Sequence, residues 1–145
     1  MVDYVELWDK LARPLSLKFD SDCDKDWSRL TETEQEMAAL WKMAADVYNG
    51  GFILFYCNWG YECYLHALRG IMRSGCTHAL DLVMGVYSSV FDKFRSDDRI
   101  QIYWDIPKFL TEQDKKTLED ADIAFWESVG EHLCEAACKF YSSHV

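Results

Sequence analysis

Three threonines, each standing before a stretch with helical periodicity, limit most strongly the folds open to this chain. Thr31-Glu-Thr-Glu34 and Thr111-Glu-Gln-Asp114 have the pattern of a capping box, in which the Thr hydroxyl and the acidic side chain three residues later each accept a backbone N–H. Thr77 marks a third helix start. Apolar residues follow the first box at spacings of three and four: Met37, Leu40, Trp41, Ala44, Ala45 and Tyr48. The pattern predicts an all-α fold, a compact single-domain helical bundle of about six to eight helices.

Proline, glycine and asparagine mark where helices are expected to end. Pro14 is expected to end a first short helix, with an acidic loop, Asp20–Asp26, after it. Asn49-Gly50-Gly51 is expected to end the second helix, because these residues tolerate positive φ. The apolar segment Phe52–Cys57 fits a buried strand or a buried helix, and we prefer the helix because a lone strand would have no partner. The helix after Thr111 is expected to continue as one helix to near the C-terminus.

The chain is strongly acidic. Its 145 residues include 25 Asp and Glu against 15 Lys and Arg, which gives a formal net charge of −10. Nucleic-acid phosphates and anionic membranes carry the same sign, so direct binding to either is disfavoured and a basic protein surface is the expected partner. Half of the residues are hydrophobic, enough for a real core, and no linker or repeat divides the chain. We therefore expect one domain over residues 1–145.

No signal peptide and no membrane span is evident. The first residues carry Asp3, Glu6 and Asp9, and no uncharged apolar run is long enough to cross a bilayer. A cytoplasmic location is expected. In such a reducing compartment the six cysteines should be free thiols: Cys23, Cys57, Cys63, Cys76, Cys134 and Cys138.

Two clusters of acidic residues are candidate partner-binding sites. Residues 110–145 hold eight acidic residues and three basic ones. Glu127, Glu131 and Glu135 are spaced by four, which predicts one stripe on a helix, with Asp120 behind it and carboxylates about 6 Å apart along the axis. That interval is of the order of phosphate spacing along a nucleic-acid strand. The second cluster is in the acidic loop: Asp20, Asp22 and Asp24.

Several patterns that could support metal binding or catalysis are incomplete. The acidic loop has oxygen ligands at calcium-loop positions, but Lys25 replaces the turn glycine and Thr31 the bidentate glutamate, so tight calcium binding is not expected. Glu62, Cys63 and His66 supply at most half a zinc site or a thiol with a nearby histidine. Cys134 and Cys138 near His132 are a similar half-site. We expect no cofactor and no catalysis, with a small metal- or thiol-dependent enzyme as the alternative.

One motif resembles a known family. The segment Asp46–Gly60, in which Asn49-Gly50-Gly51-Phe52 is followed by Asn58, resembles the signature of a bacterial family of unknown function that includes a neisserial DNA mimic. Ala67–Ile71 and Phe125-Trp126 are also similar, and the resemblance covers about residues 31–141. It implies an all-helical fold and, as for that member, blocking of a DNA-binding protein by imitation of DNA charge. Taken alone, the motif indicates a helix stop followed by an aromatic anchor.

The leading hypothesis is an acidic, non-enzymatic inhibitor that binds a basic, nucleic-acid-binding protein. Two settings fit the charge equally well: a DNA mimic that occupies a DNA-binding protein, and an immunity protein that neutralises a nuclease toxin. The sequence does not distinguish them, and it is compatible with a homodimer.

Overall fold

The computed structural model describes residues 1–143 and consists of helices with no strand in that range. Six α-helices occur: α1 (Tyr4–Ser21), α2 (Glu32–Gly50), α3 (Phe52–Ser74), α4 (Thr77–Val86), α5 (Glu112–Ala124) and α6 (Gly130–Ser142). Three short segments are 3-10 helices: η1 (Trp27–Arg29), η3 (Asp92–Phe94) and η4 (Tyr103–Phe109). Two are π-helical turns: η2 (Tyr87–Phe91) and η5 (Phe125–Val129). The predicted all-α class is confirmed.

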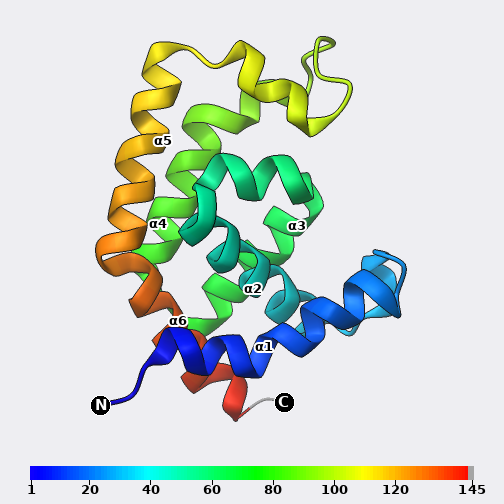
Figure 1. The fold of residues 1–145 in the computed structure, drawn as a ribbon, viewed down its shortest axis with the longest axis vertical. Coiled ribbons are helices and arrows are strands. Elements are labelled where there is room, and N and C mark those ends of the chain that lie inside the picture. The colour runs from blue at the N-terminus through cyan, green and yellow to red at the C-terminus, as the bar shows by residue number, and fades with distance from the viewer. Residues whose placement is uncertain (144–145) are drawn as a thin grey trace.

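Helices α2 and α3 pack together at the centre of the molecule (Figure 1). Helix α1 packs on α2, and α6 contacts both α1 and α3. On another side α4 lies beside α5, and both contact α3. Within residues 1–143 no helix has the length and hydropathy needed to cross a membrane.

Two of the three predicted helix caps are confirmed. Thr31 and Thr111 each accept a backbone N–H, from Glu34 and Asp114, and both capping boxes are complete. Thr77 is not a cap: it is the first residue of α4, and the N-cap position is Cys76, whose side chain makes no capping bond. Cys76 is buried in the core, so the start of α4 is determined by core packing and not by a capping side chain.

Pro14 does not end the first helix, contrary to expectation, because α1 continues to Ser21. Proline removes one backbone donor, and here the residue lies on the exposed side of the helix, where water can satisfy the carbonyl left without a partner. Trp8 and Phe19, one on each side of the proline, are both buried and hold the two halves in place.

The segment Phe52–Cys57 is helical, as preferred, and begins α3 directly after Gly51. Gly51 has a φ of 90° and ends α2, as the Asn-Gly-Gly sequence predicts. Inside α3, Gly60 has a φ of 78°, which kinks the helix.

The helix after Thr111 is not one regular helix. The π-helical turn η5 separates α5 from α6, which run in different directions (Figure 1). Such a wide turn inserts an extra residue into the helical register, a common cause of kinks. Gly130 then begins α6 in close contact with the Tyr48 hydroxyl, where any side chain would collide with it.

Candidate partner-binding surface

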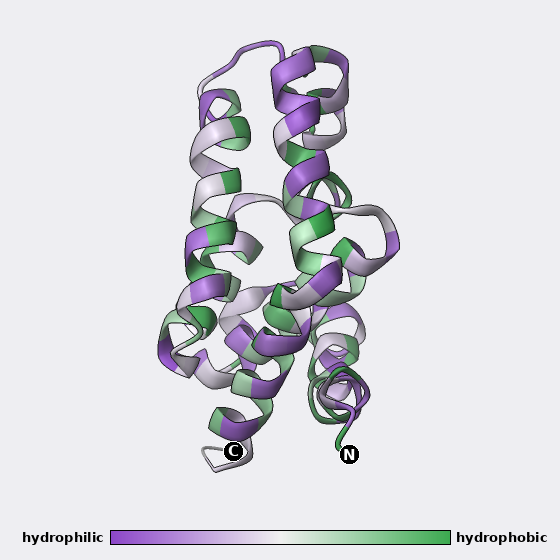
Figure 2. Ribbon diagram, turned by 90° about the vertical axis from the view of Figure 1, so that its left-hand side faces the viewer, coloured by the Kyte–Doolittle hydropathy of each residue, from purple (hydrophilic) through white to green (hydrophobic). Residues whose placement is uncertain are grey.

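Helix α5 lies along the side of the molecule that Figure 2 turns toward the viewer, and hydrophilic and hydrophobic residues alternate along the helices there. Asp120, Glu127 and Glu131 are exposed, and Glu135 is partly exposed. We call these four residues, as a group, the α5–α6 acidic surface. The sequence interval of four keeps Glu131 and Glu135 on the same face of α6.

Two members of this surface have no neutralising partner. Glu127 and Glu131 make no ion pair with any residue in the described range 1–143. Asp120 pairs with Lys116 at 2.8 Å, and Glu135 pairs with Lys139 at 3.2 Å, both on the exposed surface. Exposed pairs of this kind are weak, so both carboxylates can exchange their lysine for another cation at low cost.

The predicted straight stripe is wrong in one respect. Glu127 lies within η5, and Asp120 lies on α5 beyond it, so the regular rise of an α-helix does not connect Asp120 to Glu131. The carboxylates follow a bent path over two helices. A groove or a curved basic surface fits such a path better than a flat one does.

Two further acidic residues adjoin this surface: Glu119, one of the eight acidic residues counted in residues 110–145, and Asp81, which the sequence did not indicate. Asp81 of α4 and Asp120 of α5 both line a cavity of about 340 Å³ between the two helices. Glu119 is exposed next to Asp120, and neither Asp81 nor Glu119 makes an ion pair with the described residues. One feature of the sequence could have indicated Asp81: it is a charged residue on the solvent side of an otherwise apolar helix.

The second predicted cluster is less available for binding. Asp20 belongs to α1, not to a loop, and it accepts a hydrogen bond of 2.8 Å from Lys42, whose side chain is 1% exposed. Asp22 and Asp24 are exposed, but Arg29 lies 3.4 Å from Asp24. Much of the negative charge here therefore compensates cations of the chain itself.

The structure does not bring the two clusters together. They lie on opposite sides in Figure 1, with α5 at one edge and the end of α1 at the other. Helix α6 packs near the start of α1, where the Cys138 thiol donates to the Tyr4 carbonyl at 3.7 Å. Asp20 is sixteen residues further along α1, roughly 24 Å at the helical rise. A single partner surface would need to be wide to reach both.

The Asn49–Phe52 motif forms the junction between α2 and α3, and α5 holds this junction in place. The Asp122 carboxylate accepts the Phe52 N–H at 2.9 Å. A side chain at Gly51 would overlap that carboxylate. Burial raises the pKa of Asp122, and the Phe52 N–H partly offsets the effect. The Trp126 indole N–H also donates to the Val47 carbonyl at 2.6 Å.

The polar residues of the motif have simple local roles. Asn49 and Gly50 are exposed at the end of α2. Asn58 donates to Asp46 at 3.3 Å, and the Trp59 indole donates to the same carboxylate at 2.9 Å. Burial raises the pKa of Asp46, against the effect of these two donors. The motif therefore connects α2, α3 and α5.

The thiol groups that could act as nucleophiles are buried. Burial raises the pKa of Cys57 to about 12 and that of Cys63 well above its ordinary value. His66 lies 3.4 Å from Glu62, but burial and the Arg69 guanidinium lower its pKa. All six cysteines are buried and none is joined to another; their free state remains a prediction for thiol titration. Among residues 1–143 no three potential ligands are grouped to hold a metal, and weak calcium binding also remains a prediction.

Comparison with known proteins identifies the family. The DMP19-like protein family matches residues 28–144, three residues beyond each predicted boundary. The resemblance drawn from the sequence is thereby confirmed at the level of the family. No curated protein and no solved structure matched the chain. Because the family match spans most of the sequence, the chain belongs to the DMP19-like protein family.

Proposed function

We propose that this protein is a DNA mimic that binds a basic, DNA-binding protein through the α5–α6 acidic surface and keeps it from DNA. The observation that carries the proposal is the pair of exposed, unpaired carboxylates of Glu127 and Glu131 in a chain of net charge −10. Membership of a family named for a DNA-mimic protein supports the same function. It also favours a DNA-binding protein over a nuclease toxin as the partner.

The spacing of the carboxylates supports imitation of a phosphate backbone. Glu131 and Glu135 are four residues apart on α6, an axial rise of about 6 Å. Proteins that bind DNA hold phosphates with Lys and Arg side chains, and those side chains accept carboxylates in a similar geometry. Complementary charge also steers the two proteins together before contact, which raises the association rate.

Within this proposal the protein acts by binding and not by catalysis. The raised pKa values of Cys57 and Cys63 support that view, because a thiol that stays protonated is a poor nucleophile.

The experiment compares two charge-reversed proteins. The test variant carries Glu127→Lys, Glu131→Lys and Glu135→Lys. The control carries Asp22→Lys, Asp24→Lys and Asp98→Lys, three exposed positions outside the α5–α6 acidic surface. Asp20 is left intact because its reversal would disrupt the contact with Lys42. Both triples change the net charge by the same amount.

Binding is measured by calorimetry against the DNA-binding protein that the wild type captures from its host at low salt. We expect the test variant to lose at least about a hundredfold in affinity, and the control to lose less than about tenfold. Equal losses would show that net charge alone drives binding. An unchanged affinity in the test variant would exclude the α5–α6 acidic surface as the contact.

A further inference from the structure

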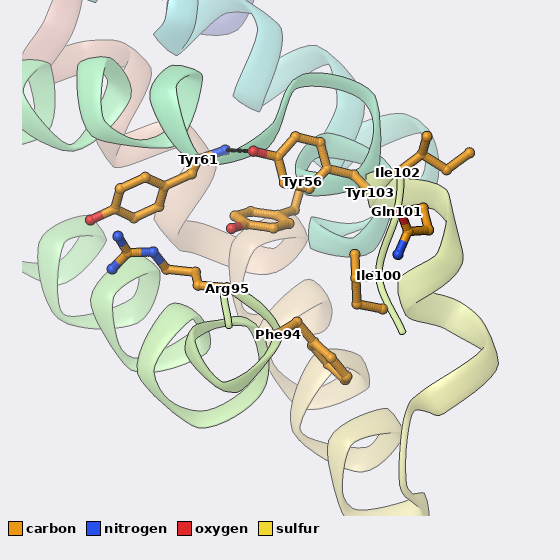
Figure 3. Close-up of a pocket in the computed structure, with 8 residues that line it drawn as sticks. All are labelled: Tyr56, Tyr61, Phe94, Arg95, Ile100, Gln101, Ile102 and Tyr103. Carbon is orange, nitrogen blue, oxygen red and sulfur yellow. Dashed lines mark hydrogen bonds between the residues drawn. The ribbon is translucent and has the colours of Figure 1, made fainter. Parts of the chain in front are cut away.

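A cavity of about 420 Å³ opens between the kink of α3 and the segment that follows α4 (Figure 3). The segment 94–103, which lines the cavity, lies at the other end of the molecule from α6 in Figure 1. Its size is within the range of pockets that hold small molecules. The proposed DNA mimicry makes no use of it.

One wall of the cavity is held in a fixed position by α3. Gly60 lacks a side chain, and the Tyr103 ring occupies the space that a Cβ there would need. The kink at Gly60 frees the backbone N–H of Tyr61, which donates to the Tyr103 hydroxyl at 3.3 Å (Figure 3). The Cys57 thiol donates to the Tyr103 carbonyl, also at 3.3 Å. The wall therefore exists before any ligand binds.

A tyrosine with a buried ring, Tyr56, lines the cavity, and its hydroxyl is accessible from it. Tyr56 is 3% exposed, and its ring stacks on Phe91 with 4.3 Å between centroids. Its hydroxyl makes no hydrogen bond with residues 1–143 and is not sealed from solvent, whereas the enclosed hydroxyl without a partner in this range is that of Tyr87. A hydroxyl that the cavity leaves accessible and that makes no bond within the protein can donate to a ligand atom there.

Arg95 is the one charged side chain among the residues that line the cavity. Its guanidinium carbon lies 3.9 Å from the centre of the Tyr61 ring, which orients the flat group. The nearest carboxylate, that of Asp92, is 4.0 Å away and only loosely paired. The Tyr87 hydroxyl also neighbours this guanidinium. A stacked arginine whose carboxylate partner is this distant still has N–H donors for an anion.

We propose that this cavity binds a small organic anion with a flat, apolar body. The acidic group of the ligand lies against Arg95 and accepts the Tyr56 hydroxyl proton in a hydrogen bond. The apolar body lies against the Tyr103 ring and Ile102, which is 64% exposed without a ligand. A cationic ligand would be repelled by Arg95, and a purely polar anion would leave the aromatic wall uncovered.

Two fluorescent probes test both halves of the proposal. The first is 1-anilinonaphthalene-8-sulfonate, a flat aromatic anion; the second is N-phenyl-1-naphthylamine, which has the same rings without the sulfonate. We expect the wild type to bind one molecule of the anion, and Arg95→Leu to bind it about tenfold more weakly or worse. The neutral probe should bind both proteins with similar affinity. Tyr56→Phe should weaken binding of the anion by about threefold or more and leave the neutral probe unaffected.

The controls separate the cavity from general dye binding. Arg13→Gln removes an exposed arginine on α1 and should change nothing. Arg95→Lys keeps the charge but not the flat stacked group, and is expected to bind the anion with intermediate affinity. Circular dichroism checks that each variant is folded, and NMR shifts of the Ile102 and Tyr103 amides check the location. The proposal is overturned if no anion binds up to about 1 mM, if Arg95→Leu binds it as well as the wild type, or if those amides do not shift.

Discussion

At the scale of single residues, the most unusual group in the core is a fully buried carboxylate. Glu36 of α2 is 0% exposed and accepts hydrogen bonds from Arg69 at 2.6 Å, Arg73 at 2.9 Å and the Tyr141 hydroxyl at 2.8 Å. These donors come from α3 and α6, so one side chain connects three helices. A buried charge is tolerated only when it is paired in this way.

Glu36→Gln should therefore destabilise the protein markedly. The amide has no negative charge and leaves two arginines without their ionic partner, which should lower the free energy of unfolding by about 2–3 kcal/mol. Both arginines are partly exposed to water, which limits the loss in the free energy of unfolding to that range. Urea unfolding measures the difference, and Glu32→Gln, an exposed position on the same helix, is the matched control. Equal stability of the two variants would contradict this account of the core.

The second capping box should make stability depend on pH. Burial alone would raise the pKa of Asp114, but hydrogen bonds from Lys93 and from the Thr111 backbone outweigh burial and hold the pKa below its ordinary value. An aspartate whose pKa is lower in the folded protein than in the unfolded chain, where it is near 3.9, stabilises the fold at pH values above that unfolded-state pKa. This contribution to stability is lost as the pH falls through the folded-state pKa.

Asp114→Asn should lower the free energy of unfolding by about 1–2 kcal/mol at pH 7, and the difference from the wild type should shrink below pH 4. Asp120→Asn, at an exposed pair, should change stability little at either pH. Thermal unfolding over pH 2.5–7 measures both. A difference for Asp114→Asn that stays constant over this range would contradict the lowered pKa.

At the scale of elements, the junction of α2 and α3 depends on a conformation that only glycine adopts easily. Gly51→Ala would place a methyl group at a φ of 90° and against the Asp122 carboxylate, and should destabilise by about 3 kcal/mol or more. Gly85→Ala, in a helix with open space around it, should instead stabilise by about 0.5–1 kcal/mol. Unfolding by urea compares the two, and a harmless Gly51→Ala would contradict the role assigned to the motif.

Local signals in the sequence were enough to predict the all-helical class and some of the helix ends. The caps at Thr31 and Thr111 and the break at Gly51 can be predicted from residues that are neighbours in the sequence. The passage of α1 through Pro14 and the π-helical turn before Gly130 depend on packing with distant helices, which periodicity does not contain.

For the candidate partner-binding surface, the sequence predicts which residues share a helix face but not which residues meet across helices. The spacing of Glu131 and Glu135 predicted a shared face because both are on one helix. The position of Asp20 could not be predicted, since its partner Lys42 is 22 residues away in the sequence. Asp81 joins Asp120 only through the packing of α4 on α5.

At the scale of the whole molecule, a charge-driven complex should weaken steeply as salt is added. The Debye length shortens from about 10 Å at 0.1 M to about 3 Å at 1 M, and exposed carboxylates such as Glu127 lose most of their attraction over that distance. The association rate should fall more than the dissociation rate rises, because steering acts before contact. Stopped-flow kinetics at several salt concentrations measures both rates. If added salt changed the dissociation rate alone, the interface would instead be dominated by short-range contacts.

The most direct test of the central claim is competition with DNA. The protein is immobilised, the captured DNA-binding protein is bound to it at low salt, and duplex DNA carrying the site of that protein is added. If the α5–α6 acidic surface imitates DNA, added duplex should release the captured DNA-binding protein, because the duplex and the immobilised protein compete for one basic site. A duplex that binds the captured protein more tightly should release more of it. A bound protein that holds DNA and this chain at the same time would contradict the account.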